Sequence, residues 1–192
     1  MERAETIVAL ATPSGTGALA VIRISGPGAF AICAECLRPR KRFVKSPARM
    51  IGVYDIVSGV DGEHIDQVTA VRYEAPRSYT GEDMVEVISH GGAIAPARVV
   101  AGLIAAGACQ AQPGEFTRRA VLHGKMDLVS AEAMDAVIGS ASIEEHGWAL
   151  RSYRGEQRRV FEDLRLELRE LEISLEADIE FPDEDLPEGI LP

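Results

Sequence analysis

The sequence contains few of the features that define secreted, membrane-spanning or disulfide-bonded proteins. Its 192 residues include only three cysteines, an odd and low number that argues against a disulfide framework and fits a reducing cytoplasm. No apolar run approaches the roughly 18 residues needed to span a bilayer. The first residues, Met1 to Glu5, lack the basic region and apolar stretch of a secretory signal. We therefore expect a cytoplasmic protein that does not enter a membrane.

Motifs that bind a nucleotide phosphate or a metal ion are also missing from the sequence. A phosphate loop needs Gly-x-x-x-x-Gly-Lys-Ser/Thr, but Gly124-Lys125 is followed by Met126, and Arg119 occupies the position of the first glycine. The four histidines show no metal-ligand spacing. The Cys33-x-x-Cys36 pair lies in a predicted helix, where we expect two small buried side chains. The sequence predicts no GTP hydrolysis by this chain, no metal site and no catalytic residue.

Charge divides the chain into two parts. The net charge is −10, but residues 1–125 carry 14 Lys/Arg against 12 Asp/Glu, whereas residues 126–192 carry 6 against 18. We therefore expect a domain boundary near residues 120–127, and the acidic second part does not suit a nucleic-acid backbone. The one basic cluster, Arg38-Pro39-Arg40-Lys41-Arg42 with Lys45, lies in the first part. Two interpretations of this cluster stay open: a solvated loop or a contact with nucleic acid.

Hydrophobic periodicity predicts a mixed first part and an all-helical second part. Apolar, β-branched runs predict strands over residues 5–11, 18–25, 50–57, 65–73, 84–89 and 108–111. Helices are expected over residues 26–37, 93–106, 115–122, 127–141 and 143–178. The last helix carries one apolar stripe, made of Val160, Leu164, Leu168, Leu171 and Leu175. Because this stripe needs more partner helices than the chain provides, we expect an incomplete helical domain. The tail from Phe181 onward is expected to be poorly ordered.

Three segments combine glycine, charged and apolar residues in a way that is typical of ligand sites. They are Ser78–Glu86, Ser89–Gly92 and Gln112–Leu128. The first leads into a predicted strand in which Glu86 shares a face with Met84 and Ile88. Burying an unpaired carboxylate is costly, so we expect Glu86 to pair with a cation or with a ligand.

These segments, together with Thr6–Gly17, Val21–Gly26 and Ala177–Glu184, resemble the amino-terminal part of the MnmE (TrmE) family of tRNA-modification GTPases. The resemblance covers nearly the whole chain, in order. It implies an α+β (α/β) tetrahydrofolate-binding and dimerisation domain over residues 1–122, similar to the folate-binding domain of glycine-cleavage aminomethyltransferases. It also implies that residues 123–192 are the first helices of an all-helical domain. The family's GTPase domain, with its GTP, Mg and K sites, and its terminal Cys motif correspond to sequence beyond Pro192.

The resemblance also implies which residues contact the folate, namely Arg23, Glu86 and Lys125. Their chemistry suits a reduced pterin, whose ring N–H and exocyclic amine are parallel donors that a carboxylate can accept together, and whose glutamyl tail is anionic. The ligand is expected to be 5,10-methylene- or 5-formyl-tetrahydrofolate. Which residue meets which part of the folate stays open. The alternative for Arg23 and Glu86 is a structural ion pair.

At the level of function, the resemblance implies a homodimer that works with an MnmG-type flavoprotein to modify C5 of the wobble uridine, and that reaches tRNA through this complex. Two other interpretations stay open. The chain could be a small stand-alone folate-dependent aminomethyl- or methyltransferase, or a scaffold that binds no folate.

Overall fold

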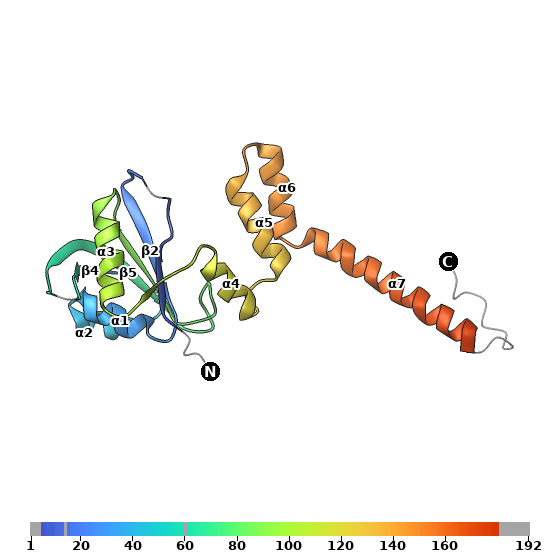
Figure 1. Cartoon of the computed structure of the whole chain (residues 1–192), viewed down its shortest axis with the longest axis horizontal. Coiled ribbons are helices and arrows are strands. Elements are labelled where there is room, and N and C mark those ends of the chain that lie inside the picture. The colour runs from blue at the N-terminus through green and yellow to red at the C-terminus, as the bar shows by residue number, and fades with distance from the viewer. Residues whose placement is uncertain (1–4, 14, 60, 181–192) are drawn as a thin grey trace. The chain divides into compact units, whose positions relative to one another are not determined.

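The computed structural model describes residues 5–13, 15–59 and 61–180, which form two compact units, divided along the chain between Met126 and Asp127 (Figure 1). The first unit contains β1 (Ile7–Leu10), β2 (Leu19–Ser25), α1 (Ala29–Cys36), β3 (Leu37–Arg38), α2 (Arg40–Val44), β4 (Gly52–Val57), β5 (His64–Tyr73), β6 (Met84–His90), α3 (Ile94–Ala105), β7 (Cys109–Gln110) and α4 (Glu115–Leu122). The second contains α5 (Leu128–Gly139), α6 (Ile143–Tyr153) and α7 (Glu156–Glu180).

A seven-stranded open sheet organises the first unit, which has a mixed α+β architecture. The strand order is β3-β4-β5-β6-β2-β1-β7. Neighbouring strands run antiparallel, except that β1 and β7 are parallel. Because side chains alternate along a strand, the register of β2 against β6 decides which residues share a face. Ile22 pairs with Val87 and Ile24 with Val85, and all four side chains are fully buried.

Helices α1 and α3 cover the face that these four residues share (Figure 1). Ala29 and Cys33 of α1, with Val99 and Leu103 of α3, complete the same core. The expectation that Cys33 and Cys36 are buried in a helix is confirmed. Burial raises the pKa of the Cys33 thiol far above its usual range, so this thiol is uncharged.

The opposite face of the sheet carries Arg23 and Glu86, which the register pairs directly. Met84 and Ile88 share this face with Glu86, as expected from the alternation. The same face also presents exposed apolar side chains, namely Leu19 at 65% and Val53 at 48% relative exposure. This face therefore combines a charged pair with an uncovered apolar area.

The basic cluster, for which a solvated loop was one of two open interpretations, contains β3 and α2. One expectation about secondary structure is wrong. The single helix expected over residues 143–178 is two helices, because Gly155 adopts a φ of +77° between α6 and α7. A left-handed residue with no Cβ ends a helix at little cost, and its N–H bonds the carbonyl of Ser152.

The second unit is helical, and each of its first two helices has an N-cap. Asp127 accepts a hydrogen bond from the Ser130 N–H at α5, and Ser142 accepts one from the Glu145 N–H at α6. The apolar stripe expected on the last helix lies on α7, where its five members are 44–65% exposed. That further helices cover this stripe stays a prediction. No helix of residues 5–180 is both long and apolar enough to cross a membrane. The tail from Phe181 lies outside the described residues.

Candidate folate-binding site

Arg23 and Glu86 form an ion pair at the centre of the sheet. Arg23 on β2 donates from Nε at 3.0 Å and from Nη2 at 2.7 Å to Oε1 of Glu86 on β6. The two side chains are 23% and 18% exposed. Of the two partners expected for Glu86, a cation or a ligand, the structure shows a cation, Arg23. A structural ion pair and a ligand site are compatible here, because each side chain stays partly exposed.

Aromatic side chains surround the pair. Tyr73 on β5 donates its hydroxyl to Oε2 of Glu86 at 3.1 Å. Burial and the Glu86 carboxylate raise the pKa of Tyr73 above its ordinary value, so this hydroxyl keeps its proton. The guanidinium of Arg23 lies 4.6 Å from the ring centroid of Tyr79 and 5.8 Å from that of Phe116. Arg23 is thus held by a carboxylate and by two rings.

The carboxylate of Glu86 can accept more hydrogen bonds than it does here. Both hydrogen bonds from Arg23 go to Oε1, whereas Oε2 accepts, among the described residues, only the one from Tyr73. A carboxylate oxygen has two lone pairs, so Oε2 can accept a further hydrogen bond without any rearrangement. A ligand that presents two parallel donors needs a second acceptor, which becomes free if the guanidinium of Arg23 moves from Oε1.

Lys125 lies just after α4, against the loop that precedes β6. Its Nζ donates to the carbonyl of Pro76 at 3.0 Å, and a Cβ built on Gly81 would lie 3.3 Å from its Cγ. The same loop carries Tyr79. Within the described residues Lys125 has no hydrogen bond or ion pair with Arg23 or Glu86. The structure therefore joins two of the three expected residues directly and places the third beside the loop that contacts them.

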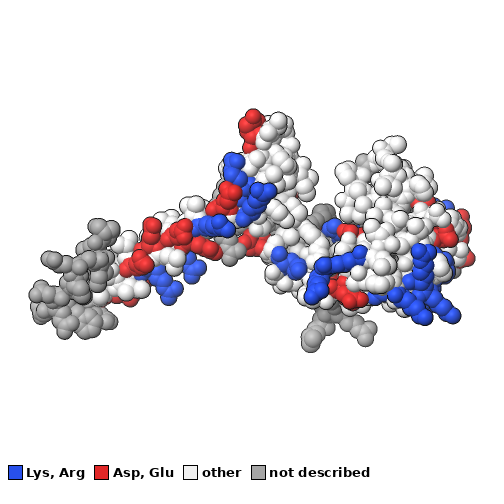
Figure 2. Space-filling view, turned by 180° about the vertical axis from the view of Figure 1, so that it is seen from behind, with Lys and Arg blue, Asp and Glu red and all other residues white. Residues whose placement is uncertain are grey.

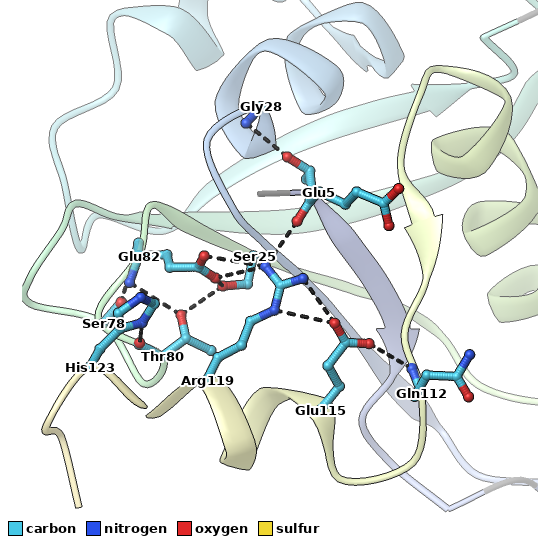
Figure 3. A network of polar contacts seen from close by, with 11 residues as sticks. Glu5, Ser25, Gly28, Ser78, Thr80, Glu82, Gln112, Glu115, Arg119 and His123 are labelled. Carbon is cyan, nitrogen blue, oxygen red and sulfur yellow. Dashed lines mark hydrogen bonds and ion pairs between the residues drawn. The ribbon is translucent and has the colours of Figure 1, made fainter. Parts of the chain in front are cut away.

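Arg119 on α4 is the centre of a second polar network (Figure 3). It donates to Glu115 at 2.8 Å, to Glu82 at 3.2 Å and to the carbonyl of Glu5 at 2.8 Å. The side chains of Arg119, Glu82 and Glu115 are only 12–14% exposed. These three residues belong to the segments that the sequence suggests for a ligand, but here they bind one another.

The network continues into the sheet through Glu82. Ser25 at the end of β2 donates to Glu82 at 2.8 Å, and its hydroxyl lies 2.6 Å from that of Thr80. His123 Nδ1 lies 2.7 Å from the carbonyl of Thr80 (Figure 3). Ser25 and Thr80 are fully buried. The network thus fastens the loop before β6 and the end of α4 to the sheet, beside the Arg23–Glu86 pair.

The charges and hydrogen bonds of this network lower the pKa of Glu115. Burial raises its pKa, but the N–H of Gln112 and the guanidinium of Arg119 outweigh burial and hold the pKa below its usual value. Sequence reasoning did not identify these ion pairs. The spacing of Glu115 and Arg119, four residues apart on a helix, was the available signal. No local signal indicated Glu82, which lies on a different segment.

The arrangement suits the recognition of a planar heterocycle with an anionic tail. Tyr73, Tyr79 and Phe116 supply aromatic surface, Glu86 supplies an acceptor, and Arg23 and Lys125 supply positive charge. These are the functional groups that a reduced folate requires. Among the described residues no group of three His, Cys, Asp or Glu is placed to hold a metal ion.

Comparison with known proteins identifies the family. Residues 6–125 match the family described as "GTP-binding protein TrmE N-terminus". The chain is 42% identical over 180 residues to the tRNA modification GTPase MnmE of Thermotoga maritima, a match that covers 94% of this chain and 39% of that protein. It is 43% identical over 187 residues to MnmE of Salinibacter ruber, with 97% of this chain and 40% of the relative covered.

The chain therefore spans about two-fifths of the length of the curated relatives it matches. The matched residues include β1 to α4, the Arg23–Glu86 pair and Lys125. The chain belongs to the TrmE amino-terminal family, which corresponds to the amino-terminal portion of the tRNA modification GTPase MnmE.

Proposed function

We propose that this chain is the tetrahydrofolate-binding and dimerising portion of a tRNA-modification GTPase. The observation that carries the proposal is the Arg23–Glu86 pair, which is 23% and 18% exposed on the sheet face opposite the helices and is lined by Tyr73, Tyr79 and Phe116. In the complete protein, an MnmG-type flavoprotein would be the partner, and C5 of the wobble uridine in tRNA would be the modified position.

Each residue has a role in this proposal. Glu86 accepts from the donors on the pterin edge, first at Oε2, where one lone pair is free, and at Oε1 once Arg23 turns toward the ligand. Tyr73 holds the Glu86 carboxylate in position. Arg23 and Lys125 attract the carboxylates of the glutamyl tail. The folate, when bound, supplies the one-carbon unit, and these residues bind and orient it.

Calorimetric titration tests the proposal directly. We expect saturable binding of 5-formyl-tetrahydrofolate with one site per chain. Titration of p-aminobenzoylglutamate, which has the tail but no pterin, should show much weaker binding, because it lacks the donors that Glu86 accepts. No saturable binding of 5-formyl-tetrahydrofolate would leave the scaffold interpretation as the correct one.

Lys125→Met is expected to weaken 5-formyl-tetrahydrofolate binding only moderately. Lys125 is exposed and donates to the carbonyl of Pro76, and an exposed charge pair contributes about 0.2–1 kcal/mol, up to roughly fivefold in affinity. The loss should be larger at low salt, where screening is weak. Lys45→Met, which removes another exposed lysine of the first unit, is the matched control and should leave the affinity unchanged. Equal effects of the two variants at every salt concentration would remove Lys125 from the site.

The chain is expected to be a homodimer through the first unit. The exposed Leu19 and Val53 on the sheet face that carries Arg23 and Glu86 provide apolar area that a second copy can cover. Light scattering at tens of micromolar should give the dimer mass, and a Leu19→Asp/Val53→Asp variant should give the monomer. Ile94→Asp, at a 72% exposed position on α3, is the control and should stay dimeric. A monomeric parent chain would refute this assignment.

A stand-alone transferase is a weaker candidate. It needs a general base near the one-carbon unit. Glu82 is engaged by Arg119 and Ser25, and Asp83 accepts from the N–H of Ala75 at 2.9 Å. A turnover assay with 5,10-methylene-tetrahydrofolate and ammonium separates the two, because only the transferase would form product.

A further inference from the structure

A basic surface lies on the first unit around α2. Residues 38–49 contain six of the chain's 20 Lys/Arg and no Asp or Glu, although the chain as a whole has a net charge of −10. All six basic side chains are exposed. Figure 2 shows a group of Lys and Arg side chains at the lower edge of this unit, where Figure 1 places α2.

The backbone that carries these charges is fixed to the core. Phe43, in the middle of α2, is 1% exposed and packs edge-on against Tyr54 with ring centroids 5.7 Å apart. Arg72 on β5 reaches the end of α2, and its Nη1 donates to the carbonyls of Val44 at 2.7 Å and of Ser46 at 3.3 Å. The basic side chains are therefore presented from an anchored segment, whereas a solvated loop would hold them in no fixed arrangement.

Most of this positive charge is not neutralised. Arg40 pairs with Glu35 at 2.8 Å. Arg38 donates to the carbonyls of Glu35 and Leu37, at 2.9 and 3.1 Å. Arg42 lies over the ring of Tyr54 at 5.6 Å. Five of the six have no ion pair with any residue in the described ranges, namely Arg38, Lys41, Arg42, Lys45 and Arg49.

We propose that this basic surface, made of Arg38, Lys41, Arg42, Lys45 and Arg49, binds the phosphate backbone of RNA. Unpaired guanidinium and ammonium groups gain affinity for a polyanion by releasing its condensed counterions. Three of the five are arginines, whose fork matches phosphate oxygens. The choice of RNA rests on the proposed function, since the relatives are tRNA-modifying proteins. Val44, Met50 and Ile51 are exposed nearby, so an anionic bilayer is the rival partner.

The test measures RNA affinity against salt. An unmodified tRNA transcript is titrated with the full chain by fluorescence anisotropy between about 50 and 200 mM salt. The variant Lys41→Gln/Arg42→Gln/Lys45→Gln should bind at least about tenfold more weakly at the low-salt end, and the slope of log K against log salt should fall by about one unit per lost contact. Circular dichroism should show an unchanged fold, because the three side chains are exposed.

A control variant that loses the same number of cations elsewhere tests whether RNA binding depends on this surface or only on the net charge of the chain. Arg118→Gln/Arg151→Gln/Arg169→Gln removes the same number of exposed cations elsewhere and should bind RNA as the parent chain does. Equal weakening by both triple variants, or no RNA binding by the parent at about 50 mM salt, overturns the proposal. Binding to phosphatidylserine vesicles without binding to RNA overturns it in favour of a bilayer. Titration of the first triple variant with 5-formyl-tetrahydrofolate should give the parent's affinity, so failure of the folate site and failure of the RNA surface remain distinguishable.

Discussion

Glu86→Gln is expected to reduce the affinity for 5-formyl-tetrahydrofolate by roughly thirtyfold to nearly a thousandfold while leaving the fold intact. Gln replaces one acceptor oxygen with an amine, so a hydrogen bond from the pterin becomes a contact between two donors, at a cost of about 2–4 kcal/mol. The remaining amide oxygen can still accept from Arg23, which also keeps its contacts with Tyr79 and Phe116. Because the pair is partly exposed, its weakening should cost about 1 kcal/mol or less of folding free energy.

The matched control for this change is Glu82→Gln. Glu82 is a carboxylate of the same segment, but it binds Arg119 and Ser25. We expect this control to lower the melting temperature and to leave the folate affinity nearly unchanged, the reverse of Glu86→Gln. Both variants should be followed by thermal melting and by calorimetry. A Glu86→Gln protein that melts several degrees lower yet binds folate normally would show that the Arg23–Glu86 pair is only structural.

Arg119→Met should strongly reduce the stability of the first unit. It leaves Glu82 and Glu115, at 14% and 12% exposure, without the cation that binds both. Removing one partner of a buried ion pair costs about 3–5 kcal/mol. We expect about 3 kcal/mol, at the low end, because these side chains keep some contact with water. For a unit of this size the melting temperature should fall by roughly 10 °C.

Acid should reduce the difference between Arg119→Met and the parent chain. In the parent, the pKa of Glu115 is lower in the folded state than in the unfolded state, so its contribution is present above the unfolded pKa and is lost as pH falls through the folded pKa. The variant lacks the part of this contribution that Arg119 supplies. The two melting temperatures should therefore stay well separated down to about pH 4.5, the ordinary pKa of a Glu carboxyl, and converge as the pH is lowered below it.

Arg118→Met is the control for the Arg119 variant. Arg118 is the neighbouring residue on α4 and is exposed, so its loss should change the folding free energy by about 0.5 kcal/mol or less. If Arg119→Met were as stable as Arg118→Met at neutral pH, the network around Arg119 would not be what fastens α4 to the sheet.

The local sequence by itself determined most of the secondary structure and one feature of the site. Alternation in Met84–Ile88 places Glu86 on the face opposite Val85 and Val87, and the structure has that arrangement. This is possible because alternation with a period of two depends only on neighbouring residues. Hydrophobic periodicity did not give the secondary structure where a single residue or a distant contact overrides it. Gly155 ends α6 although the apolar pattern continues, and α2 forms where Phe43 and Arg72 anchor a basic segment.

Only the tertiary structure decided which charges meet. The sequence offered Arg23 as one candidate partner of Glu86, and the register of β2 against β6 brings them together across 63 residues. Arg119 reaches Glu82 across 37 residues and the carbonyl of Glu5 across 114. Such contacts depend on how distant segments pair, and many pairings satisfy the same local preferences. Burial then fixes the choice, because a carboxylate left without a partner inside the fold is far more costly than one in water.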